Sequence, residues 1–188
     1  MNHPRLLWAT AVANALLSAC ATPEPVGPPR KEMVVAVTDA AELIQFNAGQ
    51  PQRILVRQPL QGLPAGDTLV GIDYRVARGV LFALSASGRL YTIDTTSAAL
   101  KPVGAAPAAA LQGSSIGVNF NPVADRIRVV TDTGQNLRLH PDTGALAATD
   151  PAVAYAPGDA RAGQAPRLAA AAYTYNKQND KLTTNYAI

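Results

Sequence analysis

The sequence predicts an all-β fold, and two patterns indicate it. Apolar runs of strand length recur along the chain, at 34–37, 80–84, 90–93, 126–130 and 137–139. Turn-forming residues lie between them, namely Thr38-Asp39, Ser87-Gly88, Asp132-Thr133-Gly134 and Asp142-Thr143-Gly144. No stretch keeps apolar residues at helical spacing over about three turns, so helices of ordinary length are not expected.

The chain also repeats itself at an offset of 46 residues. Segment 71–74 (Gly-Ile-Asp-Tyr) aligns with 117–120 (Gly-Val-Asn-Phe), and the turn glycines Gly88 and Gly134 coincide. Weaker copies occur at 43–46, which resembles 90–93, and at 186–188, which resembles 91–93. Repeats of this length with several strands each predict β-propeller-like blades. The alternative is a sandwich or barrel that contains one duplicated pair of hairpins.

The N-terminus has the order of a secretory signal peptide. Arg5 precedes an apolar run at 6–17, and the small residues Ser18 and Ala19 follow it. A transmembrane helix is the alternative, but a helix that crosses a bilayer needs about 20 apolar residues. We therefore expect 1–19 to be a signal peptide and the mature protein to be exported.

The only cysteine of the chain ends this segment. Leu17-Ser18-Ala19-Cys20 resembles the lipobox of bacterial lipoproteins, in which the cysteine is acylated. Two or more acyl chains hold a protein to a bilayer; the alternative is an unmodified thiol. The resemblance implies lipidation at Cys20 and a membrane partner, and Ala21 after it favours the outer membrane, facing the periplasm or the surface. Prolines then predict a stiff tether at 20–32, before a partial repeat domain at 33–188.

The repeat motifs resemble one exported bacterial family. The similarity is carried by 69–75 and 88–94 in one repeat and by 119–122, 125–130 and 133–139 in the next. The family is domain of unknown function 4394, which implies propeller-like repeats and no assigned activity. Its members continue past the motif at 184–188, so the ring predicted here is incomplete. Either another chain completes it, with self-association through an open sheet edge, or the sequence is a truncated product without function.

Few residues could carry catalysis or nucleic-acid binding. Past Cys20 the only histidine is His140, which precedes a turn, and no nucleophile elbow or phosphate loop is present. The net charge is only +3 and no basic run exceeds the pair Arg30-Lys31, so no nucleic-acid partner is expected.

Asp73 and Asn119 are the candidate metal ligands. They occupy the same place in successive repeats, and oxygen ligands that meet in a central channel could hold Ca²⁺ in a lactonase-like or esterase-like hydrolase. The alternative is that each side chain ties one blade to the next through a hydrogen bond to the backbone.

Other polar residues have structural interpretations. Asp132 and Asp142 each precede a glycine by two positions, which predicts turns in which the carboxylate bonds its own backbone. Four arginines, Arg75, Arg126, Arg128 and Arg138, alternate with apolar residues and predict either an anion-binding rim or a solvated face with ion pairs to Asp73 or Asp125.

Two functions are consistent with the sequence. The first is a non-enzymatic module on a membrane-anchored lipoprotein, which binds a protein or glycan of the cell envelope. The second is the calcium-dependent hydrolase. Fold alone does not decide between them.

Overall fold

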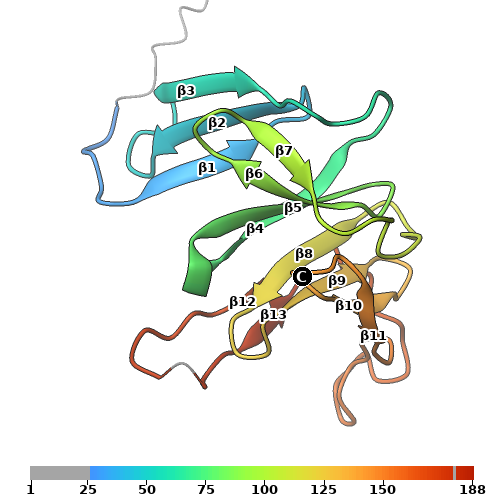
Figure 1. The fold of residues 1–188 in the computed structure, drawn as a ribbon. Coiled ribbons are helices and arrows are strands. Elements are labelled where there is room, and N and C mark those ends of the chain that lie inside the picture. Colours follow the sequence, from blue (N-terminus) through green and yellow to red (C-terminus); the bar gives the residue numbers. More distant parts are fainter. Residues whose placement is uncertain (1–25, 180) are drawn as a thin grey trace, which may run out of the picture.

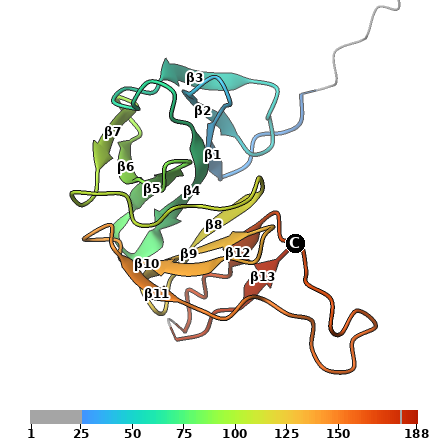
Figure 2. The same cartoon turned by 90° about the vertical axis from the view of Figure 1, so that its right-hand side faces the viewer.

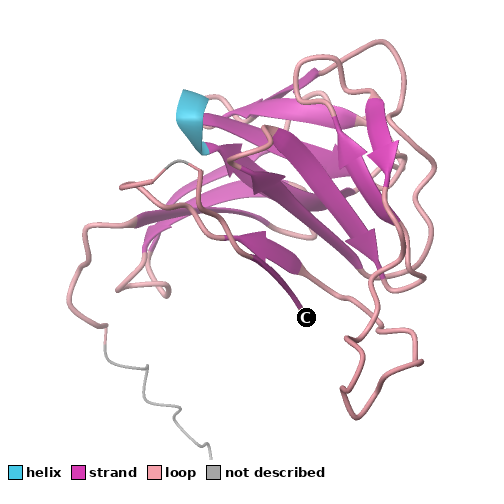
Figure 3. Cartoon of the chain, turned by 90° about the horizontal axis from the view of Figure 1, so that it is seen from below, coloured by secondary structure: helices cyan, strands magenta, loops and turns pink. Residues whose placement is uncertain are grey.

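The computed structural model describes residues 26–179 and 181–188. Apart from one helical turn, η1 (Val76–Arg78), its regular elements are strands, in agreement with the predicted all-β class (Figure 3). All five apolar runs that the sequence analysis singled out lie in strands. The predicted signal peptide at 1–19 and the predicted lipidation site Cys20 lie outside the described residues. Within these residues no helix is long and apolar enough to cross a membrane.

The strands form four antiparallel sheets that follow one another along the chain (Figures 1 and 2). The first sheet contains β1 (Met33–Val37), β2 (Glu42–Asn47) and β3 (Ile54–Pro59). The second contains β4 (Leu69–Arg75), β5 (Val80–Ser85), β6 (Leu90–Asp94) and β7 (Ala99–Pro102). The third contains β8 (Ile116–Asn121), β9 (Arg126–Thr131), β10 (Asn136–Leu139) and β11 (Leu146–Thr149). The fourth contains β12 (Ala171–Tyr173) and β13 (Asn185–Ala187).

The second and third sheets are two copies of one blade. Each is a meander in which neighbouring strands pair in chain order, and the two sheets correspond at the offset that the sequence repeat predicts. The first strands of successive sheets contact one another, β4 against β8 and β8 against β12. We refer to β4, β8 and β12 as the inner strands. Sheets that pack in sequence through their faces and share a row of inner strands have the arrangement of propeller blades.

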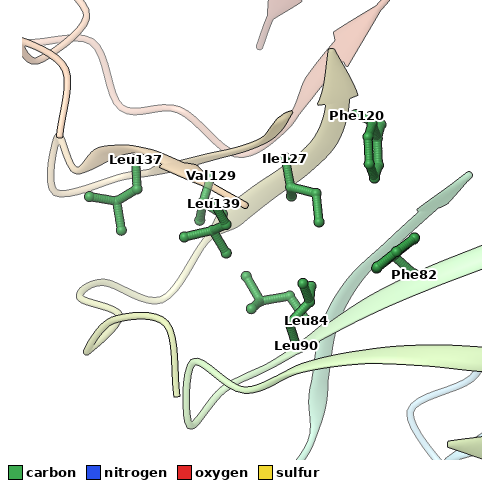
Figure 4. Packing of buried hydrophobic residues seen from close by; sticks show 8 residues of the cluster. All are labelled: Phe82, Leu84, Leu90, Phe120, Ile127, Val129, Leu137 and Leu139. Atoms are coloured by element: carbon green, nitrogen blue, oxygen red, sulfur yellow. The ribbon is translucent and has the colours of Figure 1, made fainter. Parts of the chain in front are cut away.

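The core lies between successive sheets. Phe82 and Leu84 of β5 belong to the cluster shared with the third sheet, whereas Leu81 and Ala83 of the same strand belong to the cluster shared with the first. Both faces of β5 are therefore buried, which explains why its sequence is continuously apolar instead of alternating. Figure 4 shows the first of these clusters. In it, the ring centroids of Phe82 and Phe120 lie 5.5 Å apart.

The sheet positions correct one part of the predicted repeat. β13 pairs directly with the inner strand β12, so it takes the place that β5 has beside β4. The alignment of 186–188 with 91–93, which lie in the third strand of a blade, is therefore wrong by one strand. The upstream copy holds, because 43–46 lie in β2, which pairs with β1 as β6 pairs with β5.

The last part of the expected tether lies along the first sheet. Asn47, at the end of β2, accepts a hydrogen bond from the backbone N–H of Arg30 at 2.8 Å and donates to its carbonyl oxygen at 2.7 Å. The side chain of Gln50 donates to the carbonyl of Gly27, and the N–H of Ala48 donates to the carbonyl of Glu32. These contacts fix the chain just before β1 against the turn between β2 and β3.

Candidate functional site

A small cavity lies beside the ends of the inner strands β4 and β8. Its volume is about 70 Å³, and it is lined by Asp73, Tyr74, Arg75, Val76, Ala77, Asn119, Phe120, Pro122, Asp125, Tyr173 and Tyr175. Both residues that the repeat singled out, Asp73 and Asn119, lie on its wall. The structure therefore brings together the two candidate ligands, although they are separated by a whole repeat.

Asp73 connects the second sheet to the third. Its Oδ2 accepts the backbone N–H of Phe120 on β8 at 2.6 Å, and its Oδ1 accepts the N–H of the next residue, Tyr74, at 2.8 Å. Neither N–H points at the partner strand of its own sheet, so the carboxylate satisfies two inner-strand donors at once. Burial raises the pKa of Asp73, and the two backbone donors act in the opposite direction.

Asn119 makes the same connection one sheet further on. Its Oδ1 accepts the backbone N–H of Tyr173 on β12 at 2.5 Å. The interpretation that these side chains tie one blade to the next through backbone hydrogen bonds is thereby confirmed. Among the described residues no group of three or more acidic, histidine or cysteine side chains could hold a metal ion, so calcium binding at Asp73 and Asn119 stays a prediction.

The repeated glycines let the inner strands approach each other. A Cβ atom on Gly71 would lie 2.6 Å from the side chain of Val118 on β8. A Cβ atom on Gly117 would lie 2.7 Å from the backbone nitrogen of Ala171 on β12. The motif Gly-x-Asp/Asn therefore has one structural meaning in both repeats: glycine allows close contact with the next inner strand, and the residue two positions later bonds that strand.

Arg75 forms a buried ion-pair cluster next to this row. Its side chain is only 5% exposed, whereas Asp125 and Asp142 remain about half exposed. The guanidinium donates from Nε to Asp125 at 2.8 Å, from Nη2 to the same carboxylate, and from Nη1 to Asp142 at 2.5 Å. It lies 6.0 Å from the ring centroid of Phe120. One arginine on β4 thus holds two turns of the third sheet, and both carboxylates raise its pKa.

The sequence pattern predicts only part of this cluster. Asp125 is a predicted partner of the arginines, which holds for Arg75, but Asp142 is predicted to bond its own turn. That assignment is wrong, because the carboxylate of Asp142 bonds Arg75 instead of its own backbone. The N–H of Asp142 donates to Nδ1 of His140 at 3.2 Å, so His140 belongs to the turn, as expected.

The local turn contact predicted for Asp132 is wrong for the same reason. Its carboxylate accepts the backbone N–H of Ser114 at 3.0 Å and the Ser114 hydroxyl at 2.9 Å, across the entrance to β8. In the second sheet the corresponding link has its partners exchanged, since Asp67 before β4 accepts the hydroxyl of Ser87 in the turn at 2.7 Å. These carboxylates hold the hairpin turns to the inner strands. Burial acts to raise the pKa of Asp67, but its hydrogen-bond donors lower it overall. The hydrogen bond from the Ser114 hydroxyl lowers the pKa of Asp132.

The remaining arginines do not form a free rim. Arg128 and Arg138 both pair with Asp150, at 3.1 and 2.7 Å. Arg128 also donates to the hydroxyl of Tyr173 at 2.6 Å, which joins the third sheet to the fourth. Arg126 donates only to the carbonyl of Asp125 among the hydrogen bonds of the described residues. Of the expected ion pairs to Asp73 or Asp125, the described residues form only the one between Arg75 and Asp125, and Arg128 and Arg138 pair with Asp150 instead.

Comparison with known proteins places the fold in a family. A search of curated proteins found no match to the chain. A family model matches residues 42–188, which covers the second and third sheets entirely and most of the first. The model describes a domain of unknown function, DUF4394, and includes the row of inner strands with both Gly-x-Asp/Asn motifs. The chain therefore belongs to the DUF4394 family.

Proposed function

We propose that the protein is an exported, membrane-anchored lipoprotein whose repeat domain binds another component of the cell envelope. The lipobox-like Leu17-Ser18-Ala19-Cys20 supports the anchor. The engagement of Asp73 and Asn119 supports a binding module over a hydrolase, since both side chains are committed to contacts between sheets. Because 27–32 is bonded to the first sheet, the part of the Pro-rich segment between Cys20 and Gly27 is what would space the domain from the lipid.

Replacing the lipidated cysteine is expected to release the protein from the membrane. Cys20→Ser removes the thiol that accepts the acyl group, so the protein should move from the membrane fraction to the soluble fraction and lose palmitate labelling. Ser18→Ala is the matched control, because a small residue stays at that position and anchoring should persist. Equal membrane association of the Cys20→Ser and wild-type proteins would contradict the anchor.

The binding role has its own test. The folded, detergent-solubilised lipoprotein is expected to recover a protein or glycan from an envelope extract, and the unfolded chain is expected not to recover it. Recovery that is the same for folded and unfolded protein would count against a binding module.

A further inference from the structure

Within the described residues, the first sheet has an unpaired edge on the side where the other sheets have their inner strand. β4 pairs with β5, and β8 pairs with β9, but β1 pairs only with β2 among the strands of the described residues. β1 corresponds to β5, because Val37 lies opposite Leu43 as Leu84 lies opposite Leu90. The place beside β1 is therefore the place of an inner strand.

The backbone of β1 presents hydrogen-bonding groups at this edge. The N–H of Thr38 donates to Glu42 of β2 at 2.9 Å, so even-numbered residues of β1 turn their backbone toward β2. Because backbone groups alternate sides along a strand, Met33, Val35 and Val37 turn theirs to the free edge. These three residues correspond to Val80, Phe82 and Leu84, whose backbone groups face β4 in the second sheet.

A cavity of about 290 Å³ lies next to the end of β1. It is lined by Val37 of β1, by Thr38 and Asp39 of the turn that follows, and by the first four residues of β4 (Leu69, Val70, Gly71, Ile72). A strand placed there would contact β4 as β4 contacts β8. The side chain of Val118 on β8 leaves no room for a Cβ atom on Gly71 of β4. Ile72 is the residue of β4 that corresponds to Val118, so the incoming strand would need a glycine where it meets Ile72.

The end of β4 indicates a second requirement. The N–H groups of Phe120 and Tyr173 are each bonded by Asp73 or Asn119 from the preceding inner strand. Tyr74, the equivalent residue of β4, has no preceding inner strand among the described residues, and its N–H is bonded by the adjacent Asp73. An Asp or Asn two residues after the incoming glycine would reach this N–H.

We propose that this cavity, the β1 slot, binds an extended segment of another polypeptide that carries Gly-x-Asp/Asn followed by an aromatic residue. The segment pairs antiparallel with β1, its glycine lies opposite Val37 and its Asp or Asn lies opposite Val35, in the register that β4 has with β5. Main-chain hydrogen bonds supply affinity, and the glycine and the carboxamide or carboxylate supply specificity. The inference rests on the proposed binding role and names its partner class.

A peptide with the sequence of 68–76, labelled with fluorescein, tests this slot on the full-length lipoprotein in detergent by fluorescence anisotropy. We expect saturable binding, and we expect the peptide with Gly71→Val to bind about tenfold more weakly or worse. In the protein, Val35→Pro removes one N–H at the free edge and is expected to weaken binding about tenfold. The matched control is Arg57→Pro on β3, at the opposite edge of the same sheet, which is expected to bind like the wild type.

Two results would overturn the proposal. One is equal binding of both peptides, or equal binding by the Val35→Pro and Arg57→Pro proteins with both folded by circular dichroism. The other is absence of peptide binding. If Val35→Pro also disrupted a dimer in that case, the slot would be assigned to a second copy of the chain. Neither result bears on the anchor, which palmitate labelling of Cys20 tests separately.

Discussion

Arg75→Ala is expected to lower the free energy of unfolding by about 3 kcal/mol. The buried guanidinium is the shared partner of Asp125 and Asp142, so its loss breaks both links from β4 to the turns of the third sheet. We place the effect at the low end of the range for broken buried ion pairs, because both carboxylates are half exposed and regain water. Urea denaturation followed by circular dichroism measures it.

Arg126→Ala is the matched control for this variant. Arg126 donates to the Asp125 carbonyl and forms no ion pair in the described part of the chain, so its replacement should change stability by about 0.5 kcal/mol or less. Equal destabilisation by the two variants would show that Arg75 does not clamp the sheets.

The same cluster makes stability depend on acid. The Arg75 guanidinium holds the pKa of Asp142 below its ordinary value. A carboxylate with a lowered folded-state pKa stabilises the fold fully above its ordinary pKa and loses that contribution as pH falls through the lower value. Urea midpoints should therefore fall in acid for the wild type, and the fall should be smaller for Arg75→Ala.

Asp73→Ala is expected to cost about 2 kcal/mol, whereas Asp73→Asn should cost about 1 kcal/mol or less. Alanine leaves the N–H groups of Tyr74 and Phe120 without their acceptor, and an unsatisfied buried donor is expensive. Asparagine keeps an acceptor oxygen, and the next repeat already uses it at Asn119. Chemical denaturation of the three proteins at neutral pH compares them.

The pH dependence separates the roles of the charge and of the acceptor. Burial raises the pKa of Asp73, so its contribution is greatest below the ordinary carboxyl pKa and declines as pH rises through the folded-state value. Asp73→Asn removes this decline, and its stability relative to the wild type should improve as pH rises. An Asp73→Asn protein that is as unstable as Asp73→Ala at every pH would contradict the hydrogen-bonding role.

Local pattern and repetition made most of the fold predictable. The runs at 80–84 and 126–130 have strand length, lie between turn-forming residues and are rich in apolar residues, which favours strands over helices. The offset that aligns Gly71 with Gly117 also aligned Asp73 with Asn119, because the same contact between inner strands occurs twice.

The long-range partners could not be predicted from the same pattern. Asp142 lies 67 residues from Arg75, and nothing in its own turn distinguishes it from an ordinary turn aspartate. The link made by Asp132 and Ser114 was hidden for another reason. The other blade makes it with Asp67 and Ser87 in exchanged places, so an alignment of identical residues cannot show that the two links are equivalent.

Asp73 and Asn119 bond the backbone of the next sheet, and calcium dependence of thermal unfolding distinguishes this role from metal binding. An ion that binds only the folded state raises the melting temperature by mass action. We expect the wild-type and Asp73→Asn proteins each to melt at the same temperature in calcium and in chelator. A rise with calcium in the wild type that Asp73→Asn abolishes would contradict the purely structural role of Asp73 and favour the calcium-dependent hydrolase.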